Sequence, residues 1–222
     1  MMGGITSPAR QWFKLGLPDF DLSETSPVKL WLDNETRRMF NIFARTNLYT
    51  TLPIIYGDLL TFGTACMLME KDDDRVVRFF PLPIGSFMIG QNAQLQVDRF
   101  AREFRMTVSQ IVEKFGLDKK TGKINWENIS DTVKAHFDNQ QFETWVDLCH
   151  VILPNDKYDP NKLDPKFKKY ISVYYEKGTT GANGAQQVSF LGGGIDDGKF
   201  LRQSGFDFFP VLAPRWIVTG KH

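Results

Sequence analysis

The sequence has few of the residues that cross-linked or metal-binding proteins depend on. Its 222 residues include two cysteines and three histidines, with no Cys-x-x-Cys or His-x-x-x-His spacing. A disulfide framework needs more cysteines at higher density, and a zinc site needs closely spaced ligands. Cys66 and Cys149 both lie in apolar, strand-like runs, which predicts buried free thiols in a reducing compartment.

An excess of one charge and a long hydrophobic run are also lacking. The chain has 27 basic and 26 acidic residues, for a formal net charge of +1. A domain that wraps nucleic acid usually has a clear basic excess, so a dedicated DNA-binding domain is disfavoured. A ring through which DNA slides is still compatible with this charge. No run has the length of a membrane span or a secretory leader, so we expect no membrane partner.

Motifs for catalysis or cofactors are missing as well. The glycines 192–194 lack the Gly-Lys-Ser/Thr ending of a phosphate-binding loop, and the consecutive acids 72–74 lack the spacing of a calcium loop, which favours a solvated turn. His150 follows Cys149 directly, and adjacent residues of a strand point to opposite faces. We therefore predict no catalytic, cofactor-binding or metal-ligating residues and no cofactor. A hydrolase that uses His150 or an aspartate in a cleft stays as a minor alternative.

The residues that are present predict a folded core preceded by helices. Hydrophobic residues make up 42% of the chain and aromatic residues 14%. Residues 1–25 have an irregular pattern. Residues 26–63 predict two helices, at about 28–45 and 48–62, because apolar residues recur at helical spacing. Pro53 lies near the first turns of the second helix, where it is tolerated, and Gly63 ends it.

After residue 63 the apolar period changes to two, which predicts strands. Residues 64–106 predict a strand meander, with a hairpin at 65–70 and 75–80, a strand at 86–90 and another at 95–106. Residues 107–138 predict short helices, the first opened by a capping box of Thr107 and Gln110 and the second at about 126–137. Residues 142–218 predict further strands, at 144–153, at 170–176 and in a proline-interrupted tail, with a flexible Gly-rich tip at 179–198. The fold class is therefore α+β, with N-terminal helices followed by mainly antiparallel strands and one or two short helices, and residues 26–222 form one domain.

Arginine and phenylalanine alternate at 99–105. In a strand, Arg99 and Arg105 share one face and Arg102 lies on the other with two phenylalanines. This pattern suits a subunit contact, where arginine is enriched. It also occurs in nucleic-acid-binding proteins, so a nucleic-acid-binding module is the second hypothesis. With Trp12 and Phe13 of the leading segment, these arginines are the candidate subunit-interface residues. In the lysine-rich stretch 157–169 interspersed aspartates cancel much of the charge, which predicts a solvated loop.

Several ordered blocks give the chain a family resemblance. The blocks are Thr6–Leu15, Asn47–Tyr49 leading to Tyr56–Ala65, Val77–Phe79 with Leu82-Pro83, Arg102–Thr107 with Gln110–Gly116, Tyr158–Pro160, and Pro210–Trp216. In this order, they resemble the head-to-tail connector (portal) family of short-tailed phages. None is a catalytic signature.

The resemblance implies a non-enzymatic subunit of a dodecameric homo-oligomeric ring at one capsid vertex, located in the virion and, before assembly, in the host cytoplasm. Its implied partners are the terminase, capsid and tail adaptor proteins, and the double-stranded DNA that passes through during packaging and ejection. The chain resembles the wing region, with stem, clip and crown expected after Gly220. We therefore expect a fragment that stays small when isolated. The tip at 179–198 is a candidate partner-contacting loop.

Overall fold

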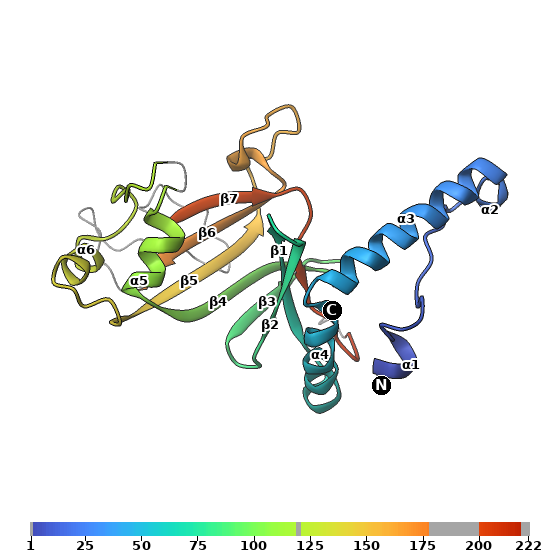
Figure 1. Ribbon diagram of the computed structural model, residues 1–222, viewed down its shortest axis with the longest axis horizontal. Coiled ribbons are helices and arrows are strands. Elements are labelled where there is room, and N and C mark those ends of the chain that lie inside the picture. The colour runs from blue at the N-terminus through green and yellow to red at the C-terminus, as the bar shows by residue number, and fades with distance from the viewer. Residues whose placement is uncertain (1, 119–120, 178–199, 219–222) are drawn as a thin grey trace. The chain divides into compact units, whose positions relative to one another are not determined.

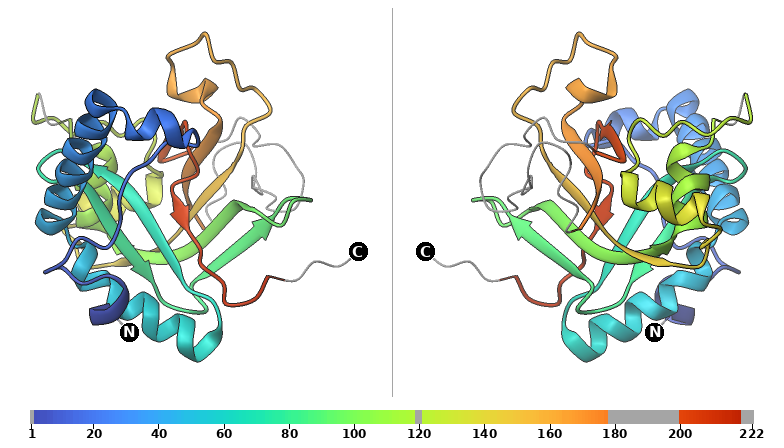
Figure 2. Two further views of the ribbon diagram at one scale, coloured as in Figure 1. Left: turned by 90° about the vertical axis from the view of Figure 1, so that its right-hand side faces the viewer. Right: turned by 90° about the vertical axis from the view of Figure 1, so that its left-hand side faces the viewer.

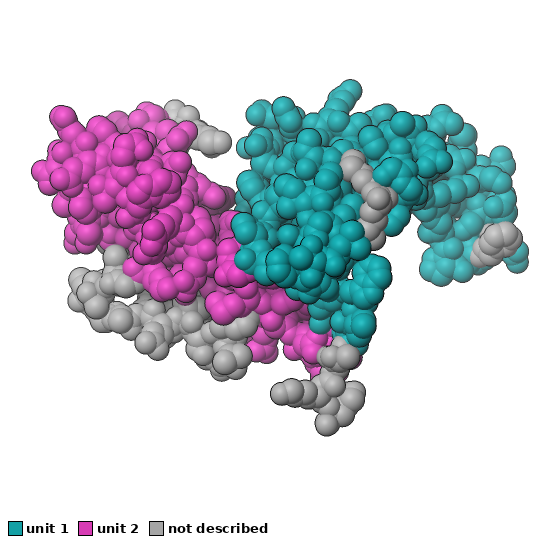
Figure 3. All heavy atoms as spheres, turned by 90° about the horizontal axis from the view of Figure 1, so that it is seen from below, with its two compact units in different colours: residues 1–84, 210–221 teal, residues 85–209, 222 magenta. Residues whose placement is uncertain are grey.

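The computed structural model describes residues 2–118, 121–177 and 200–218, and the chain divides into two units. Unit 1 consists of residues 1–84 and 210–221, and unit 2 consists of residues 85–209 with 222 (Figure 3). Each unit is built around its own antiparallel sheet. The predicted α+β class, with helices preceding strands, is confirmed. The sequence pattern predicted one domain over 26–222, whereas the structure separates that span into parts of two units.

Unit 1 holds the N-terminal helices and a three-stranded sheet (Figure 1). Its elements are α1 Met2–Ile5, α2 Phe20–Glu24, α3 Ser26–Arg45, α4 Leu48–Phe62, β1 Cys66–Asp72, β2 Val76–Leu82 and β8 Val211–Leu212. The two predicted long helices are confirmed. The leading segment is not wholly irregular, because it contains α1 and α2, the latter capped by the Asp19 side chain, which accepts from Leu22 N at 3.1 Å.

Buried polar groups fasten the leading segment to α3. Thr36 is fully buried, and its hydroxyl donates to the Leu32 carbonyl at 2.7 Å. The same oxygen accepts from Leu15 N at 3.1 Å. Because an unpaired buried hydroxyl is costly, Thr36 stabilises the contact between the segment and the helix.

The sheet of unit 1 has the order β2-β1-β8 and so joins segments far apart in sequence. β1 and β2 form the predicted hairpin, and β8 pairs antiparallel with β1 through Met67↔Leu212 and Leu68↔Val211. Gly63 ends α4 with φ +72°, a conformation that a residue without Cβ adopts at little cost, and β1 starts three residues later. The core of the unit is formed by Leu48, Ile55, Ala65, Met67 and Phe79.

Unit 2 contains one five-stranded antiparallel sheet of order β3-β4-β5-β6-β7 (Figures 1 and 2). Its elements are β3 Phe87–Gln91, β4 Val97–Thr107, α5 Val108–Ile111, the π-helical turn η1 Val112–Gly116, α6 Asp131–Asp138, β5 Trp145–Pro154, the 3-10 turn η2 Pro165–Phe167, β6 Tyr170–Glu176 and β7 Arg202–Phe206. The helices bury apolar side chains against one face of the sheet, in a cluster of Val108, Ile111, Val112, Ile129, Val133, Leu148, Tyr174 and Leu201.

Two local predictions about unit 2 have clear outcomes. The capping box is confirmed: the Thr107 hydroxyl accepts from Gln110 N, and the Gln110 side chain accepts from Thr107 N. The helix predicted from residue 126 begins instead at Asp131. Ser130 is its N-cap and accepts from Val133 N at 3.2 Å, while Ile129 N bonds the Trp126 carbonyl in a preceding turn.

The predicted meander over 64–106 is divided between the two sheets. β1 and β2 belong to unit 1, whereas β3 and β4 belong to unit 2. The chain leaves the first sheet after Leu82 and turns at Gly85, whose φ is +91°. As a result, Phe79 and Phe100 are buried against different sheets, although the predicted meander would place both in one. The tip predicted at 179–198 lies outside the described residues.

Candidate subunit interface

The candidate arginines lie on β4, near the middle of the five-stranded sheet. Both faces of the strand are covered at its centre, where Phe100 is fully buried and Ala101 is 5% exposed. Toward the end of the strand, Glu103 and Arg105 are exposed. The exposed part of the strand is therefore confined to this end, and Arg99 is half-buried.

Two of the three arginines are already engaged within the chain. Arg105 Nε lies 2.7 Å from Oδ1 of Asp147, its cross-strand neighbour, and Arg99 Nε lies 3.9 Å from Asp98 Oδ1. Beside them, Lys177 Nζ donates to Glu103 Oε2 at 2.6 Å. The Arg105–Asp147 and Lys177–Glu103 pairs are exposed on both sides and add little stability, because water already solvates both charges. Charged groups of a partner surface can therefore replace these ion pairs with little loss of free energy.

Arg102 faces the opposite side, in a row of side chains that crosses the sheet. The paired residues of this row are Phe87, Arg102, His150, Tyr174 and Arg202. The Arg102 guanidinium lies 4.6 Å from the centroid of the Phe104 ring, and its buried Nε has no hydrogen-bond partner among the described residues. This arginine is therefore part of the packed face that carries the helices rather than of an open surface.

His150 is fully buried at the centre of that row. Its ring stacks on Tyr174 with centroids 3.8 Å apart and planes 8° apart, and its Nε2 lies 2.9 Å from Ser172 Oγ. Burial holds the pKa of His150 well below its usual value, and the positive charges of Arg102 and Lys114 lower this pKa further. The two charges that act on the His150 ring are both positive and disfavour its protonation. His150 therefore stays neutral and packs between the Ser172 hydroxyl and the Tyr174 ring.

Cys149 and His150 do point to opposite faces, as the sequence predicted. Cys149 is hydrogen-bonded to Tyr175, and burial raises the pKa of its thiol, which keeps it protonated and unreactive. In residues 2–118, 121–177 and 200–218, no three His, Cys, Asp or Glu side chains are grouped so as to hold a metal ion. The carboxylate of Asp72 closes its own hairpin: Oδ1 accepts from Asp74 N and Arg75 N, and Oδ2 from Arg78 Nε.

Trp12 and Phe13 contact α3 and α4 within unit 1. Trp12 Nε1 donates to Tyr49 Oη at 3.1 Å, and the Trp12 ring meets Phe13 edge-on at 4.8 Å. Phe13 continues to Phe43 at 5.8 Å, and Phe43 to Phe79 at 6.4 Å. Both residues are half-buried, so they fasten the leading segment and still present part of their surface. They belong to unit 1, whereas the arginines of β4 belong to unit 2.

Sequence reasoning missed two surface features. One is an open apolar pocket at the end of α4, where large side chains are exposed on both the helix and the tail. The other is the loop between β5 and β6, which was expected to be merely solvated and in which the Asn155 side chain donates to the carbonyls of Lys166 and Lys168. The signal for the pocket was α4 itself, which is apolar on more than one face and carries a single charge. The signal for the loop was Asn155, because an asparagine side chain commonly hydrogen-bonds the backbone of a turn.

The described residues thus define an α+β protein on two antiparallel sheets whose buried polar groups serve the scaffold. The chain matches, over residues 1–222, the family described as bacteriophage head to tail connecting protein. It is 45% identical over 221 residues to the portal protein of Salmonella phage epsilon15, covering 100% of this chain and 35% of that protein. It is 38% identical over 220 residues to the probable portal protein of Bordetella phage BPP-1, covering 99% of this chain and 35% of that protein.

The chain belongs to the bacteriophage head to tail connecting family. It spans 35% of the length of these two curated relatives.

Proposed function

We propose that this chain is the wing-like part of a subunit of a phage portal ring, with residues 1–25 as a leading segment and residues 26–222 as the wing. The observation that carries the proposal is the match over 99–100% of the chain to a portal protein at 45% identity and to a probable portal protein at 38% identity. In this proposal the protein is structural and not catalytic. The chemistry of His150 and Cys149 supports this, since both are buried and in their neutral forms.

The full-length protein would form a dodecameric ring at one capsid vertex. It would join head to tail, bind the packaging terminase, the capsid and the tail adaptors, and let double-stranded DNA pass during packaging and ejection. It would reside in the virion after assembly in the host cytoplasm. No helix among the described residues is long and apolar enough to cross a membrane. The rigid joint between β4 and α5, fixed by its capping box, supports a scaffold role.

Solution mass determined by light scattering tests the proposal. We expect the full-length protein to form a large closed ring and the 222-residue chain to stay small. A full-length protein that stays monomeric at every accessible concentration would overturn the ring assignment. Mass photometry of the same samples then distinguishes a closed ring of one size from open-ended aggregates.

The predicted interface residues Arg99, Arg102, Arg105, Trp12 and Phe13 stay part of this proposal. Arg105 gives the cleanest test because its side chain is 69% exposed. Arg105→Glu should weaken ring assembly of the full-length protein about tenfold or more, because it places like charges beside Asp147 and against the partner. Arg38→Glu on α3, where the side chain is 74% exposed, is the matched control and should leave assembly unchanged.

The nucleic-acid-binding alternative makes a different prediction for the same arginines. A dedicated module would bind duplex DNA as an isolated chain, with an affinity that falls steeply with salt. Because the arginines at 99 and 105 are paired with carboxylates and the net charge is +1, we expect no such binding. Gel-shift titrations at low and moderate salt decide between the two functions.

A further inference from the structure

Arg102 on β4 is a half-buried arginine whose charge has no carboxylate partner among the described residues. Its Nε is buried and has no hydrogen-bond partner there, and its guanidinium lies against the ring of Phe104, 4.6 Å from the centroid. A guanidinium is a donor only, and a buried donor without an acceptor is costly. Arg102 therefore has unused donors for a group that accepts hydrogen bonds.

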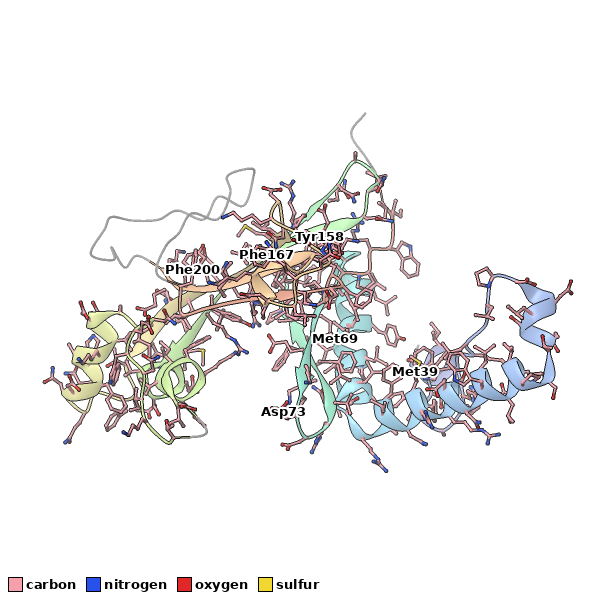
Figure 4. The ribbon with its side chains drawn as sticks, turned by 90° about the horizontal axis from the view of Figure 1, so that it is seen from above. Met39, Met69, Asp73, Tyr158, Phe167 and Phe200 are labelled. Carbon is pink, nitrogen blue, oxygen red and sulfur yellow. The ribbon has the colours of Figure 1, made fainter. Side chains whose placement is uncertain are left out.

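His150 is the cross-strand neighbour of Arg102 and holds a second unpaired group on the same face of the sheet. Side chains directly opposed on antiparallel strands have Cβ atoms about 5 Å apart. His150 is fully buried, and its Nδ1 has no partner among the described residues, whereas Nε2 lies 2.9 Å from Ser172 Oγ. When the Ser172 hydroxyl donates to Nε2, Nδ1 carries the proton and becomes a donor beside Arg102. The opposite face of this sheet has its own apolar cluster, against which Phe200 packs (Figure 4).

The charges around these two donors are positive. Among the described residues, the charged groups that act on the His150 ring are Arg102 and Lys114, with no carboxylate. Lys114 Nζ lies 5.1 Å from the centroid of the Tyr174 ring, which stacks on His150. Arg202, the cross-strand neighbour of Tyr174, adds an exposed cation at the end of the row. Such an excess of one charge raises the local concentration of anions.

The carboxylates nearest in the fold are engaged or distant. Glu176 on β6 accepts from Ser130 N and Oγ. Asp98 lies four residues before Arg102 on the same strand, which separates them by about 13 Å of extended backbone. Glu113 is exposed on η1 and takes part in no ion pair among the described residues. The described part of the chain therefore supplies the donors and not the acceptor.

We propose that Arg102, together with His150 Nδ1, binds an oxyanion, either a carboxylate or a phosphate group. Lys114 and Arg202 would add positive charge at the exposed side of the site. Hydrogen bonds from a guanidinium to a carboxylate or a phosphate are charge-assisted and often bidentate, which makes arginine well suited to this ligand. Two sources have this chemistry: free phosphate, and a carboxylate side chain of a neighbouring copy. The second source rests on the proposed function, because it needs a neighbouring subunit.

Thermal melting of the 222-residue chain in sodium phosphate and in sodium chloride of equal ionic strength tests the site. We expect the melting temperature to be about 3–5 °C higher when phosphate is about tenfold above its dissociation constant, because phosphate binds the folded state. Arg102→Met should abolish this difference. In chloride it should melt no lower than the unsubstituted chain, because it removes an unpaired charge. Arg105→Met, which removes an arginine paired with Asp147, is the matched control and should keep the difference.

Nitrogen-15 NMR of the histidine rings gives a readout that a merely structural arginine would not move. Phosphate should shift the Nδ1 resonance of His150 and leave that of His136, whose Nδ1 lies 2.6 Å from Gln141 Oε1, unchanged. A melting temperature that rises while the His150 resonance stays still would place the anion elsewhere and overturn the assignment. Equal melting temperatures in phosphate and chloride would also overturn it, and would show that water or another group of the chain satisfies the donors.

The full-length protein then decides between the two sources. If the oxyanion is a carboxylate of a neighbouring subunit, Arg102→Met should weaken ring assembly about tenfold or more, and phosphate should compete with assembly of the unsubstituted protein. If it is free phosphate, rings of Arg102→Met should form normally and lack the phosphate-dependent rise in melting temperature. A full-length protein that forms no ring contradicts the proposed function and leaves the melting result of the 222-residue chain as the test of the site.

Discussion

Three polar side chains show how each unit satisfies its interior at the scale of single residues. Asn47, the residue before α4, bonds both backbone groups of Phe79 on the edge strand β2: Oδ1 accepts from Phe79 N at 2.9 Å and Nδ2 donates to Phe79 O at 2.6 Å. In unit 2, His150 Nε2 lies 2.9 Å from Ser172 Oγ. Glu176 accepts from Ser130 N and Oγ, and so joins β6 to the first turn of α6. In each contact, a buried polar group exchanges its hydrogen bond to water for a hydrogen bond within the protein.

Asn47→Ala should lower the free energy of unfolding by about 1–3 kcal/mol, because it leaves the N–H and C=O of Phe79 without their partners at a strand edge. Urea denaturation of the 222-residue chain measures the change. Asn34→Ala on the exposed surface of α3 is the control and should change stability little. Equal stability of Asn47→Ala and the unsubstituted chain would show that water takes over both groups freely.

The stability of the chain should fall as pH decreases below 6.5, the ordinary pKa of histidine. Because burial and the nearby Arg102 and Lys114 lower the pKa of His150 in the folded state, the unfolded chain binds more protons in this range. Each pH unit between the folded and unfolded pKa values costs about 1.4 kcal/mol. Urea denaturation between pH 5 and 7 measures the slope.

His150→Gln removes the titrating group and should flatten that slope. The glutamine keeps a polar group within reach of Ser172, so the comparison does not depend on an empty cavity. Identical slopes for the two proteins would show that another group controls the acid sensitivity.

At the scale of elements, one connection of unit 2 packs closely against the sheet. The η2 turn packs against β7 at Gly205, where a Cβ would lie 2.2 Å from the Pro165 carbonyl oxygen and 2.7 Å from Lys168 Cβ. Since one of these atoms is backbone, neither side can move away easily. The turn therefore depends on glycine at this position, and it lies in the connection between β5 and β6.

Gly205→Ala should lower stability by about 1–3 kcal/mol, because the added methyl group overpacks this contact. Gly57→Ala in α4 is the opposite case: nothing lies within 4 Å of the added Cβ, and alanine favours a helix. That variant should gain about 0.5–1 kcal/mol. Thermal melting of the two variants side by side checks both signs, and a Gly205→Ala protein as stable as the parent would contradict the packing argument.

At the scale of the whole molecule, the chain enters unit 1, builds unit 2 and returns to unit 1. The return places β8 on β1, with further bonds from Ala65 N to Pro214 O and from Met69 N to Pro210 O. Unit 1 therefore needs contacts between residues more than 120 positions apart. Bringing such distant segments together costs more chain entropy than forming local contacts does.

Two neighbouring residues of β8 test this dependence. Val211 is 5% exposed and Leu212 is 46% exposed. Val211→Asp should destabilise unit 1 by at least about 2 kcal/mol, because it buries a charge against β1, whereas Leu212→Asp should have little effect. Hydrogen exchange read by mass spectrometry should show faster exchange in β1 and β2 for Val211→Asp alone. Equal exchange in both variants would show that β8 is dispensable.

Local signals in the sequence were sufficient for most elements. Helix periodicity placed α3 and α4, Gly63 placed the end of α4, alternation placed the principal strands, and Thr107 with Gln110 placed the start of α5. The start of α6 was predicted five residues early, because the apolar Trp126 and Ile129 fit a helical period although they pack in the turn before Ser130. The candidate interface residues stay a prediction, and only the contacts each makes inside its own unit are now known.

The sequence alone determined the α+β class, the absence of a recognisable catalytic motif and the family resemblance, because these depend on composition, local periodicity and short ordered blocks. The tertiary structure decided which strands share a sheet, that β8 completes unit 1, that the Asn155 side chain bridges the loop between β5 and β6, and that Leu60, Phe62 and Trp216 meet at one pocket. Strand partners and surface pockets are set by contacts between distant residues, and in a single sequence no local pattern specifies which distant residues will meet.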